Sequence, residues 1–335
     1  MKNFKKNSII LLILTVIVLV FVLKDDFFSI VDSLKRVNLL WISIAFLLQV
    51  GMIFFESLAF DKIIKSYKKD HPFKNTFKLA VITKFFNGIT PFSSGGQPMQ
   101  VYYLKKDGFR LTKATNIIMQ NFILYQLALV TVGTISLGLN MYFDYFASTK
   151  LLKYLVTTGF IINSLVMVGL FIISFSKRFN KFIINLALNI LTKLKIVKNR
   201  EEQEAKWMEI CIDFHEGATY IKNNKFLCFK GYIYNIIALI MLYLIPFFVF
   251  KALNTSINLS LVGVIVASSY VAIIGSFVPV PGASGGIEFG FLQFFGNFLG
   301  GSILSAGLLI WRTITYYLPI FIGGLVFNLR REKRQ

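Results

Sequence analysis

The sequence has few of the residues that soluble enzymes use for chemistry. It holds only two cysteines and two histidines among 335 residues. The histidines lie far apart and lack clustered acidic or thiol partners, so neither a metal site nor a cofactor is expected. Phosphate-binding glycine loops, the dinucleotide fingerprint and the H-E-x-x-H zinc motif are all absent. No histidine accompanies the serines at Ser93, Ser94 or Ser284, which argues against a catalytic triad.

Acidic residues are also scarce, with 16 Asp+Glu against 36 Lys+Arg and a formal charge of +20. A basic balance can indicate nucleic-acid binding, but no nucleic-acid recognition module is present. The lysines and arginines lie instead in loops between apolar runs. We therefore expect membrane lipids with anionic headgroups as partners, and no nucleic acid. The sequence leaves the oligomeric state open, and a homo-oligomer is one alternative.

Apolar residues are abundant. The chain is 56% hydrophobic and 16% aromatic, with a mean hydropathy of +0.66, whereas soluble domains contain about 45–50% apolar residues. A helix needs about 20 residues to cross the hydrocarbon core of a bilayer. The predicted fold class is therefore an all-α polytopic integral membrane protein of a bacterial-type plasma membrane. Its candidate transmembrane helices are 8–23, 39–60, 114–140, 151–175, 231–250 and 303–328.

Basic residues in the loops predict the orientation of these helices. The N-terminus, the C-terminal tail and the loops 61–78, 104–113 and 177–230 together hold 28 of the 36 Lys+Arg. By the positive-inside rule this first group of loops is cytoplasmic, and so are both termini. The less basic segments 24–38, 141–153 and 251–259 are expected on the other side.

Two short motifs interrupt apolar segments. "TPFSSGGQPMQ" spans 90–100 and "VPGASGGIEFG" spans 280–290. Aligned from Pro91 and Pro281, they share Pro, Ser, Gly and Gly at the same offsets.

The flanks of the two interrupted segments predict their shape. Segment 77–103 has basic flanks on both sides and is too short for two crossings, so it is predicted to be a re-entrant hairpin. Segment 260–299 is predicted to be a second hairpin entering from the opposite face. A crossing by 260–280 alone is the alternative, because that stretch is long enough.

These segments predict two inverted repeats. Residues 1–140 form the first repeat, with its hairpin at 77–103. Residues 141–230 contribute helix 151–175, which opens the second repeat, and a cytoplasmic amphipathic segment whose 177–200 stretch lies at the membrane surface. Residues 231–335 complete the second repeat with the hairpin at 260–299. Broken helices at membrane depth are tolerated where they are buried in protein or line a polar cavity.

Ionisable residues inside apolar segments are candidates for function, because burying a charge in the hydrocarbon is costly. Arg312 has two interpretations: it binds a lipid phosphate with its two-pronged guanidinium, or it forms a structural pair with Glu288. Lys84 either extends to the membrane surface or lies at the entrance of a headgroup pathway. Glu56 lies near the inner end of its helix, where it meets water.

The hairpin tips supply the other candidate substrate-binding residues. The predicted set, from the two motifs and the last helix, comprises Ser94, Gly95, Gly96, Gln97, Gln100, Ser284, Gly285, Gly286 and Tyr316, together with Arg312, Glu288 and Lys84. No catalytic residue is predicted.

The segments "PFSSGGQPMQVYYL", "PVPGASGGIE" and "RTITYYLPIFIGG" together resemble the transmembrane flippase region of lysylphosphatidylglycerol synthases. The resemblance covers nearly the whole chain, but Gln97 and Gln100 stand where that family commonly has Glu and Arg. In full-length synthases a soluble domain transfers lysine to phosphatidylglycerol, and the membrane region is linked to moving the product lipid between leaflets. The resemblance therefore implies lipid translocation, and lysyl transfer is not expected of this sequence.

The leading hypothesis is a lipid flippase for a phospholipid or another anionic or aminoacylated lipid. One alternative is a membrane-embedded transferase that uses Glu288 as a base. A second alternative is a membrane scaffold for a lipid-modifying enzyme. A transferase changes the lipid covalently, whereas a translocator changes only its leaflet.

Overall fold

The computed structural model describes residue 32 and residues 34–146, 150–175, 177–193, 199–253 and 260–332. All regular structure in these ranges is helical. Four helices are long and apolar enough to cross a membrane: α3 (Leu39–Tyr67), α6 (Leu111–Phe143), α10 (Lys225–Ala252) and the continuous run Gly301–Leu329. They confirm the predictions at 39–60, 114–140, 231–250 and 303–328. The predicted helix 8–23 lies outside the described residues.

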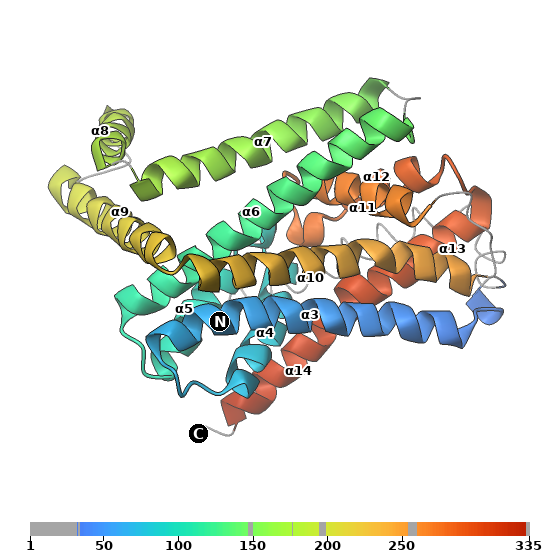
Figure 1. The fold of residues 1–335 in the computed structure, drawn as a ribbon, viewed down its shortest axis with the longest axis horizontal. Coiled ribbons are helices and arrows are strands. Elements are labelled where there is room, and N and C mark those ends of the chain that lie inside the picture. Colours follow the sequence, from blue (N-terminus) through green and yellow to red (C-terminus); the bar gives the residue numbers. More distant parts are fainter. Residues whose placement is uncertain are drawn as a thin grey trace.

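The helices α3 and α10 lie side by side over most of their length (Figure 1). A small residue permits this close packing, since a Cβ on Gly51 would meet the Met241 thioether. The helix α6 also packs on α10 and buries Ala128 and Val132 against Leu239. In apolar surroundings such tight contacts stabilise helix pairs through dispersion forces.

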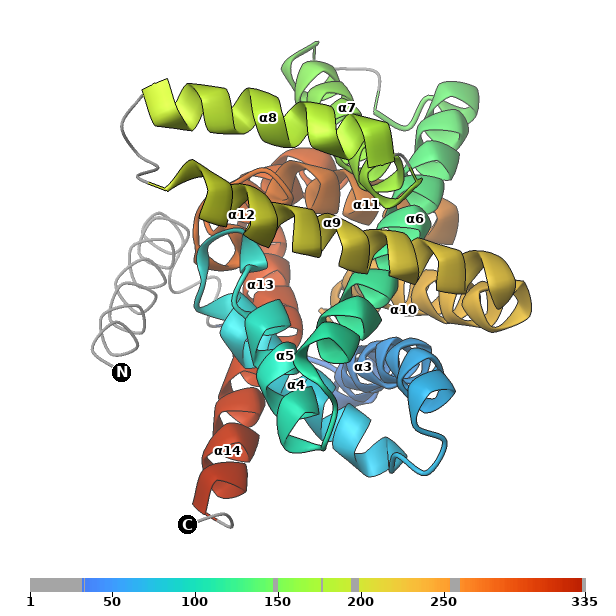
Figure 2. The ribbon, with the colours of Figure 1, turned by 90° about the vertical axis from the view of Figure 1, so that its left-hand side faces the viewer.

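The helix α7 (Lys150–Phe175) occupies the predicted span 151–175 and packs on α6 and α11. Its clearly apolar part, Tyr154–Gly169, is shorter than the four long helices' apolar windows. Two further helices follow, α8 (Lys177–Lys193) and α9 (Arg200–Asn223), and both lie across one end of the bundle (Figure 2).

The surface of α8 agrees with the amphipathic pattern of the sequence. Phe182, Leu186 and Ile190 are exposed at four-residue spacing, which places them on one face. Ile184 and Leu188, on another side, are buried. An exposed apolar stripe on a basic helix is typical of helices that lie on a bilayer surface.

Both motifs break helices where the sequence predicts. The first break separates α4 (Phe73–Gly88) from α5 (Gly96–Lys106), with the short turn η1 (Pro91–Ser93) between them. The second break separates α11 (Leu261–Gly275) from α12 (Gly286–Phe295), with η2 (Pro281–Ala283) between them. In each pair the two helices pack against each other as a hairpin. The 15 residues of α11 are too few to cross a bilayer alone, which favours the hairpin over the crossing at 260–280.

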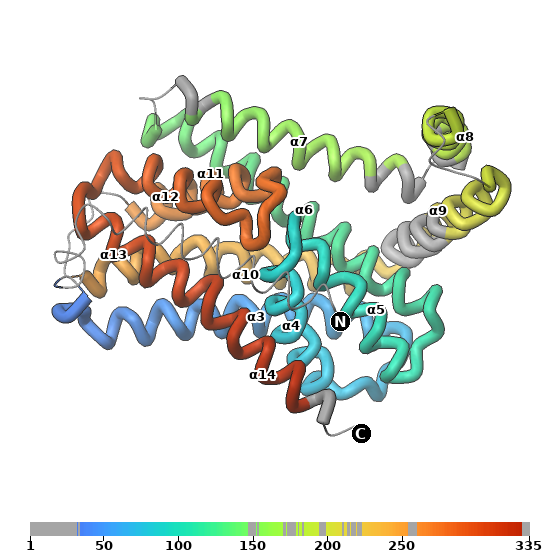
Figure 3. Tube along the Cα trace, turned by 180° about the vertical axis from the view of Figure 1, so that it is seen from behind, coloured from blue at the N-terminus to red at the C-terminus, as the bar shows by residue number. Residues whose placement is uncertain are grey.

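The last apolar run is not a uniform α-helix. It consists of α13 (Gly301–Arg312), a π-helical segment (Thr313–Tyr317) and α14 (Leu318–Glu332). The run passes obliquely from the second hairpin to the first, as Figure 3 shows from behind. Its α13 end packs on α12 and its α14 end packs on α4. The periodicity of the sequence predicts the helix but not its π segment.

The two ends of the first hairpin lie at the same end of the molecule. The Asp107 carboxylate, just after α5, is 3.4 Å from His71 Nε2, just before α4. The Asp107 carbonyl also accepts a hydrogen bond from Lys68 Nζ at 3.3 Å. The chain therefore leaves this end at residue 73 and returns to it at residue 106, which is the geometry a re-entrant hairpin requires.

A re-entrant first hairpin predicts the sidedness of chemical labelling. In a variant with Cys211 and Cys228 changed to Ser, single cysteines at Lys69 and Lys106 should react with an impermeant maleimide from the same side of intact vesicles. A cysteine at Asp144, beyond the far end of α6, should react only from the other side. Labelling of positions 69 and 106 from opposite faces would contradict the re-entrant hairpin.

Candidate functional site

The two helix breaks share a backbone conformation as well as a motif. Before each turn the chain is extended, with φ −122° and ψ 145° at Thr90 and φ −119° and ψ 146° at Val280. Each turn then contains two residues of positive φ. These are Phe92 (52°) and Ser93 (52°) in the first and Gly282 (63°) and Ala283 (50°) in the second.

The serine that follows each turn makes the same hydrogen bond. Ser94 Oγ donates to the Pro91 carbonyl at 2.9 Å, and Ser284 Oγ donates to the Pro281 carbonyl at 3.1 Å. The backbones diverge at this serine, where ψ is −14° at Ser94 and 139° at Ser284. The sequence alignment of the motifs therefore corresponds to a local structural match from the residue before the proline to the residue before the shared serine.

The turns η1 and η2 contact each other, and η2 also contacts α4. The two tips therefore meet. Because the tips come from segments far apart in the sequence, the meeting point joins the two halves of the chain.

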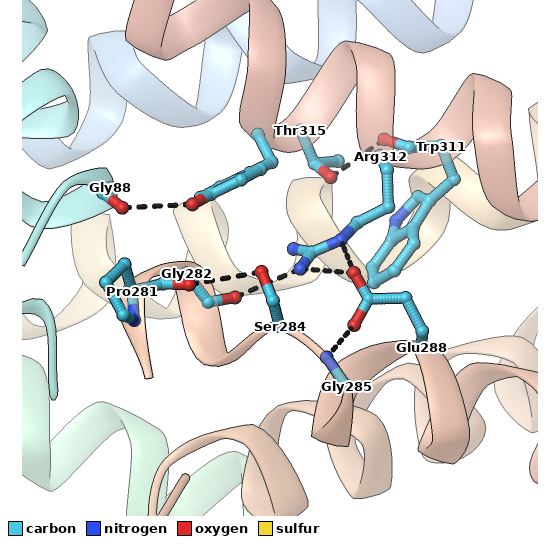
Figure 4. Close-up of polar contacts among 10 residues, drawn as sticks. Gly88, Pro281, Gly282, Ser284, Gly285, Glu288, Trp311, Arg312 and Thr315 are labelled. Atoms are coloured by element: carbon cyan, nitrogen blue, oxygen red, sulfur yellow. Dashed lines mark hydrogen bonds and ion pairs between the residues drawn. The ribbon is translucent and has the colours of Figure 1, made fainter. Parts of the chain in front are cut away.

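A buried ion pair holds the second tip. Arg312 Nε donates to Glu288 Oε1 at 2.6 Å, and Arg312 Nη2 donates to the Gly282 carbonyl at 3.1 Å. The other Glu288 oxygen, Oε2, accepts from the Gly285 amide at 2.6 Å (Figure 4). Both charged side chains are nearly inaccessible, at 5% and 6% exposure. The predicted pairing of Arg312 with Glu288 is therefore confirmed, and the pair also binds backbone groups that the helix break leaves free.

Tyr316 connects this second tip to the first. Its hydroxyl donates to the Gly88 carbonyl, at the end of α4, at 2.9 Å. Its ring lies 4.5 Å from the Arg312 guanidinium carbon, which is cation–π geometry. A Cβ on Gly282 would overlap the same ring. Tyr316 thus touches both hairpins, and Arg312 lies one helical turn before it.

The glycine amides of the tips are already hydrogen bonded. In the first tip Gly95 N donates to Thr90 Oγ1 at 2.8 Å, and Gly96 N donates to Asn87 Oδ1 at 2.9 Å. In the second tip the Gly285 amide donates to Glu288, as above. These three N–H groups stabilise the breaks in this conformation and are not presented to a ligand. Gly286 begins α12 and packs against Val278.

The polar side chains of the tips are more accessible. Gln97 and Gln100 lie in the first turns of α5 and are half-buried. Ser94 is exposed and Ser284 is half-buried. These four side chains are more accessible than those of Glu288 and Arg312, and their role in binding a ligand stays a prediction.

A second ion pair lies between α3 and α4. Lys84 Nζ is 2.5 Å from Glu56 Oε2, and the two side chains are 23% and 25% exposed. Neither of the sequence-based interpretations, Lys84 at the membrane surface and Glu56 in water, included this pairing. The signal was present, because a lone base and a lone acid in apolar helices are expected to find partners.

A buried polar network at the base of the first hairpin was also missed. Asp61 Oδ1 accepts from Thr76 Oγ1 at 3.0 Å, and Thr76 Oγ1 is 3.3 Å from His71 Nδ1. His71 reaches Asp107 on its other side, and Lys65 pairs with Asp61 at 2.8 Å. No motif links these positions in the sequence. The network fixes the ends of α3, α4 and α5 relative to one another.

The fold and the site together define a multi-pass helical membrane protein with two broken-helix hairpins that meet around a buried arginine. The family model for the lysylphosphatidylglycerol synthase transmembrane region matches residues 8–323. The chain belongs to this family.

Similar proteins from archaea and mycoplasmas cover nearly the whole chain. A UPF0104 membrane protein of Methanocaldococcus jannaschii is 26% identical over 98% of this chain and 96% of its own length. A UPF0104 membrane protein of Archaeoglobus fulgidus is 24% identical over 88% of each chain. An uncharacterised protein of Mycoplasma genitalium is 22% identical over 95% of this chain and 86% of its own.

The contact between Gly282 and Tyr316 predicts a local stability effect. Gly282→Ala should destabilise the protein by about 2–4 kcal/mol, because positive-φ strain adds to overlap with the Tyr316 ring. The matched control is Gly301→Ala, which has φ 59° but nothing within 4 Å of the new Cβ. It should show the strain alone, about 1–2 kcal/mol. Thermal unfolding in detergent measures both, and equal losses would contradict the packing of Tyr316 on this tip.

Proposed function

We propose that the protein moves a phospholipid, or another lipid with an anionic or aminoacylated headgroup, between the leaflets of the membrane. The meeting of the two broken helices around Arg312 carries this proposal. Irregular backbone at membrane depth is tolerated where it is buried in protein or lines a polar cavity, and transporters place substrate sites at such breaks. The family adds support, since its description names an aminoacylated phospholipid synthase.

The proposed topology follows from the same features. The halves are inverted repeats, with the hairpin 77–103 entering from the cytoplasm and 260–299 entering from outside. Both termini are cytoplasmic. The matched backbone of the two turns supports the repeat, and the shared end of residues 71 and 107 supports the re-entrant first hairpin.

Arg312 would bind the lipid phosphate. A guanidinium donates two parallel hydrogen bonds, and here it already donates from two nitrogens, to Glu288 and to Gly282. A phosphate that displaces Glu288 would take over the same donors. The polar side chains of the tips, Ser94, Gln97, Gln100 and Ser284, would contact the headgroup.

A transferase is the second candidate function, because Glu288 is a buried carboxylate at the second tip. Its Oε1 and Oε2 both accept hydrogen bonds, from Arg312 and from Gly285. Both oxygens are already occupied by donors, so neither is free to accept a proton from a substrate. The geometry therefore favours translocation. Mass spectrometry of the lipid after incubation separates the two functions, because translocation leaves its mass unchanged.

The double variant Arg312→Leu/Glu288→Leu tests the role of the pair. Either single leucine should lose about 3–5 kcal/mol of stability, because it leaves a buried charge unpaired. The double variant should fold, because apolar replacement of both partners is often close to neutral. We expect it not to move fluorescent phosphatidylglycerol from the inner to the outer leaflet of reconstituted vesicles, as measured by dithionite quenching.

Two further variants sharpen this assay. Arg312→Lys keeps the charge but not the two-pronged donor, so translocation should also fall. Lys106→Gln, at an exposed site after the first hairpin, is the matched control and should translocate like the wild type. A double-leucine variant that moves lipid at the normal rate would refute phosphate binding by Arg312.

A further inference from the structure

The two ion pairs inside the helical bundle differ in accessibility. Arg312 and Glu288 are 5% and 6% exposed, and both Glu288 oxygens accept hydrogen bonds. Lys84 and Glu56 are 23% and 25% exposed. Within the described residues Glu56 is paired with Lys84 through Oε2. The Glu56–Lys84 pair is therefore the pair that a ligand can reach without first opening the hairpin junction.

Lys84 lies close to that junction. It precedes Gly88 by four residues on α4, so the two share one face and are about 6 Å apart along the helix axis. The Gly88 carbonyl accepts the Tyr316 hydrogen bond that links the hairpins. A group bound to Lys84 would thus lie one helical turn from the point where the tips meet.

The surroundings of the pair are mostly apolar. Lys84 Nζ lies 3.8 Å from the Met52 thioether, and Met52 packs in a cluster with Ala80 and Ala238. In such surroundings a net charge is costly, whereas a neutral pair is tolerated.

Within the described residues, tyrosines lie on the helices that pack around the Glu56 helix α3. Tyr125 on α6 interacts with Glu56 electrostatically. The helix α10 brings Tyr243, which interacts with Tyr125, and Tyr234, whose ring contacts Phe55. The π segment, which also contacts α3, carries Tyr316 and Tyr317. In the described part of the chain no second acid or base pairs with Glu56 or Lys84.

We infer that Glu56 and Lys84 form a binding site that takes up one phosphate ester anion together with one proton. The inference rests on the proposed function and adds to it an anion site one helical turn from the junction at which Arg312 would bind the phosphate. Glu56⁻ and Lys84⁺ sum to zero, and an incoming phosphodiester would leave a net charge of −1. One proton from water on the Glu56 carboxylate restores neutrality, and Lys84 exchanges the carboxylate for the phosphate. The proton comes from hydronium in the solvent, so one O–H bond of hydronium breaks as the O–H bond of the Glu56 carboxyl forms.

This coupling has a defined pH dependence. Where Glu56 is ionised in the free protein, one proton enters with each anion, so the affinity rises about tenfold for each unit that the pH falls. A lipid headgroup and a soluble phosphodiester share the chemistry that the site recognises, so the experiment must separate them.

The test is calorimetric titration of the purified full chain in detergent with dihexanoylphosphatidylglycerol. Titrations in two buffers of different ionisation enthalpy report the number of protons taken up. The wild type should take up one proton per lipid bound. Glycerophosphoglycerol, which has the same phosphodiester without acyl chains, distinguishes the sources. Weaker binding of this compound, with the same proton uptake, identifies the lipid as the ligand, and equal binding identifies a soluble phosphodiester.

Variants of the pair assign the proton and the anion. Glu56→Gln should bind with an affinity independent of pH and take up no proton. Lys84→Gln should lose at least about tenfold in affinity, since a charge-assisted hydrogen bond is removed, and Lys84→Arg should retain binding. Lys78→Gln, at an exposed position on the same helix, is the matched control and should behave like the wild type. If Glu56→Gln does not fold, Glu56→Gln/Lys84→Gln provides a neutral pair, which should bind weakly at every pH.

Wild-type binding without proton uptake would overturn the inference, and so would unchanged uptake in the Glu56 variant. The leaflet assay fails or succeeds independently. Proton-linked binding without translocation would refute the proposed function and keep the site. Translocation without proton-linked binding would keep the proposed function and refute the Glu56–Lys84 site.

Discussion

Every helix break in an apolar bundle leaves backbone N–H and C=O groups without partners, and this structure depends on how those groups are satisfied. In the first tip Thr90 and Asn87 accept the glycine amides. In the second tip Glu288 accepts the Gly285 amide and Arg312 donates to the Gly282 carbonyl. An unsatisfied group in hydrocarbon costs several kcal/mol, so these side chains are a condition for the breaks to exist.

The two halves solve this problem with different chemistry. The first tip uses neutral side chains, and its nearest ion pair, Glu56 with Lys84, is set one turn away and is partly accessible. The second tip uses an ion pair directly, and that pair is buried. The two similar turns therefore have different surroundings. The ion pair near the first tip is partly exposed, whereas the ion pair at the second tip binds the backbone of Gly282 and Gly285.

The sequence predicts those parts of the molecule that local chemistry determines. Proline and glycine act on their own backbone, so Pro91 and Pro281 locate the breaks without any knowledge of the fold. A lone arginine in an apolar run requires an acceptor, which made the Arg312–Glu288 pair predictable. The Asp61–Thr76–His71–Asp107 network was not predictable, because it depends on how three helix ends pack and leaves no pattern in the chain. From the sequence alone, Glu56 and Lys84 have separate roles. Their pairing depends on the packing of α3 on α4, which the sequence does not show.

The interrupted last helix explains how one element reaches both hairpins. Its α13 part packs on α12, and its α14 part packs on α4. Between them the π segment, a form that is frequent at functional sites, carries Tyr316, and Arg312 directly precedes it. The Arg312 guanidinium lies on the Tyr316 ring. Arg312, which binds the second tip, is therefore stacked on Tyr316, which donates a hydrogen bond to Gly88 at the first hairpin. Tyr316 therefore links the two tips through its hydrogen bond to Gly88, its contact with Gly282 and its place in the π segment.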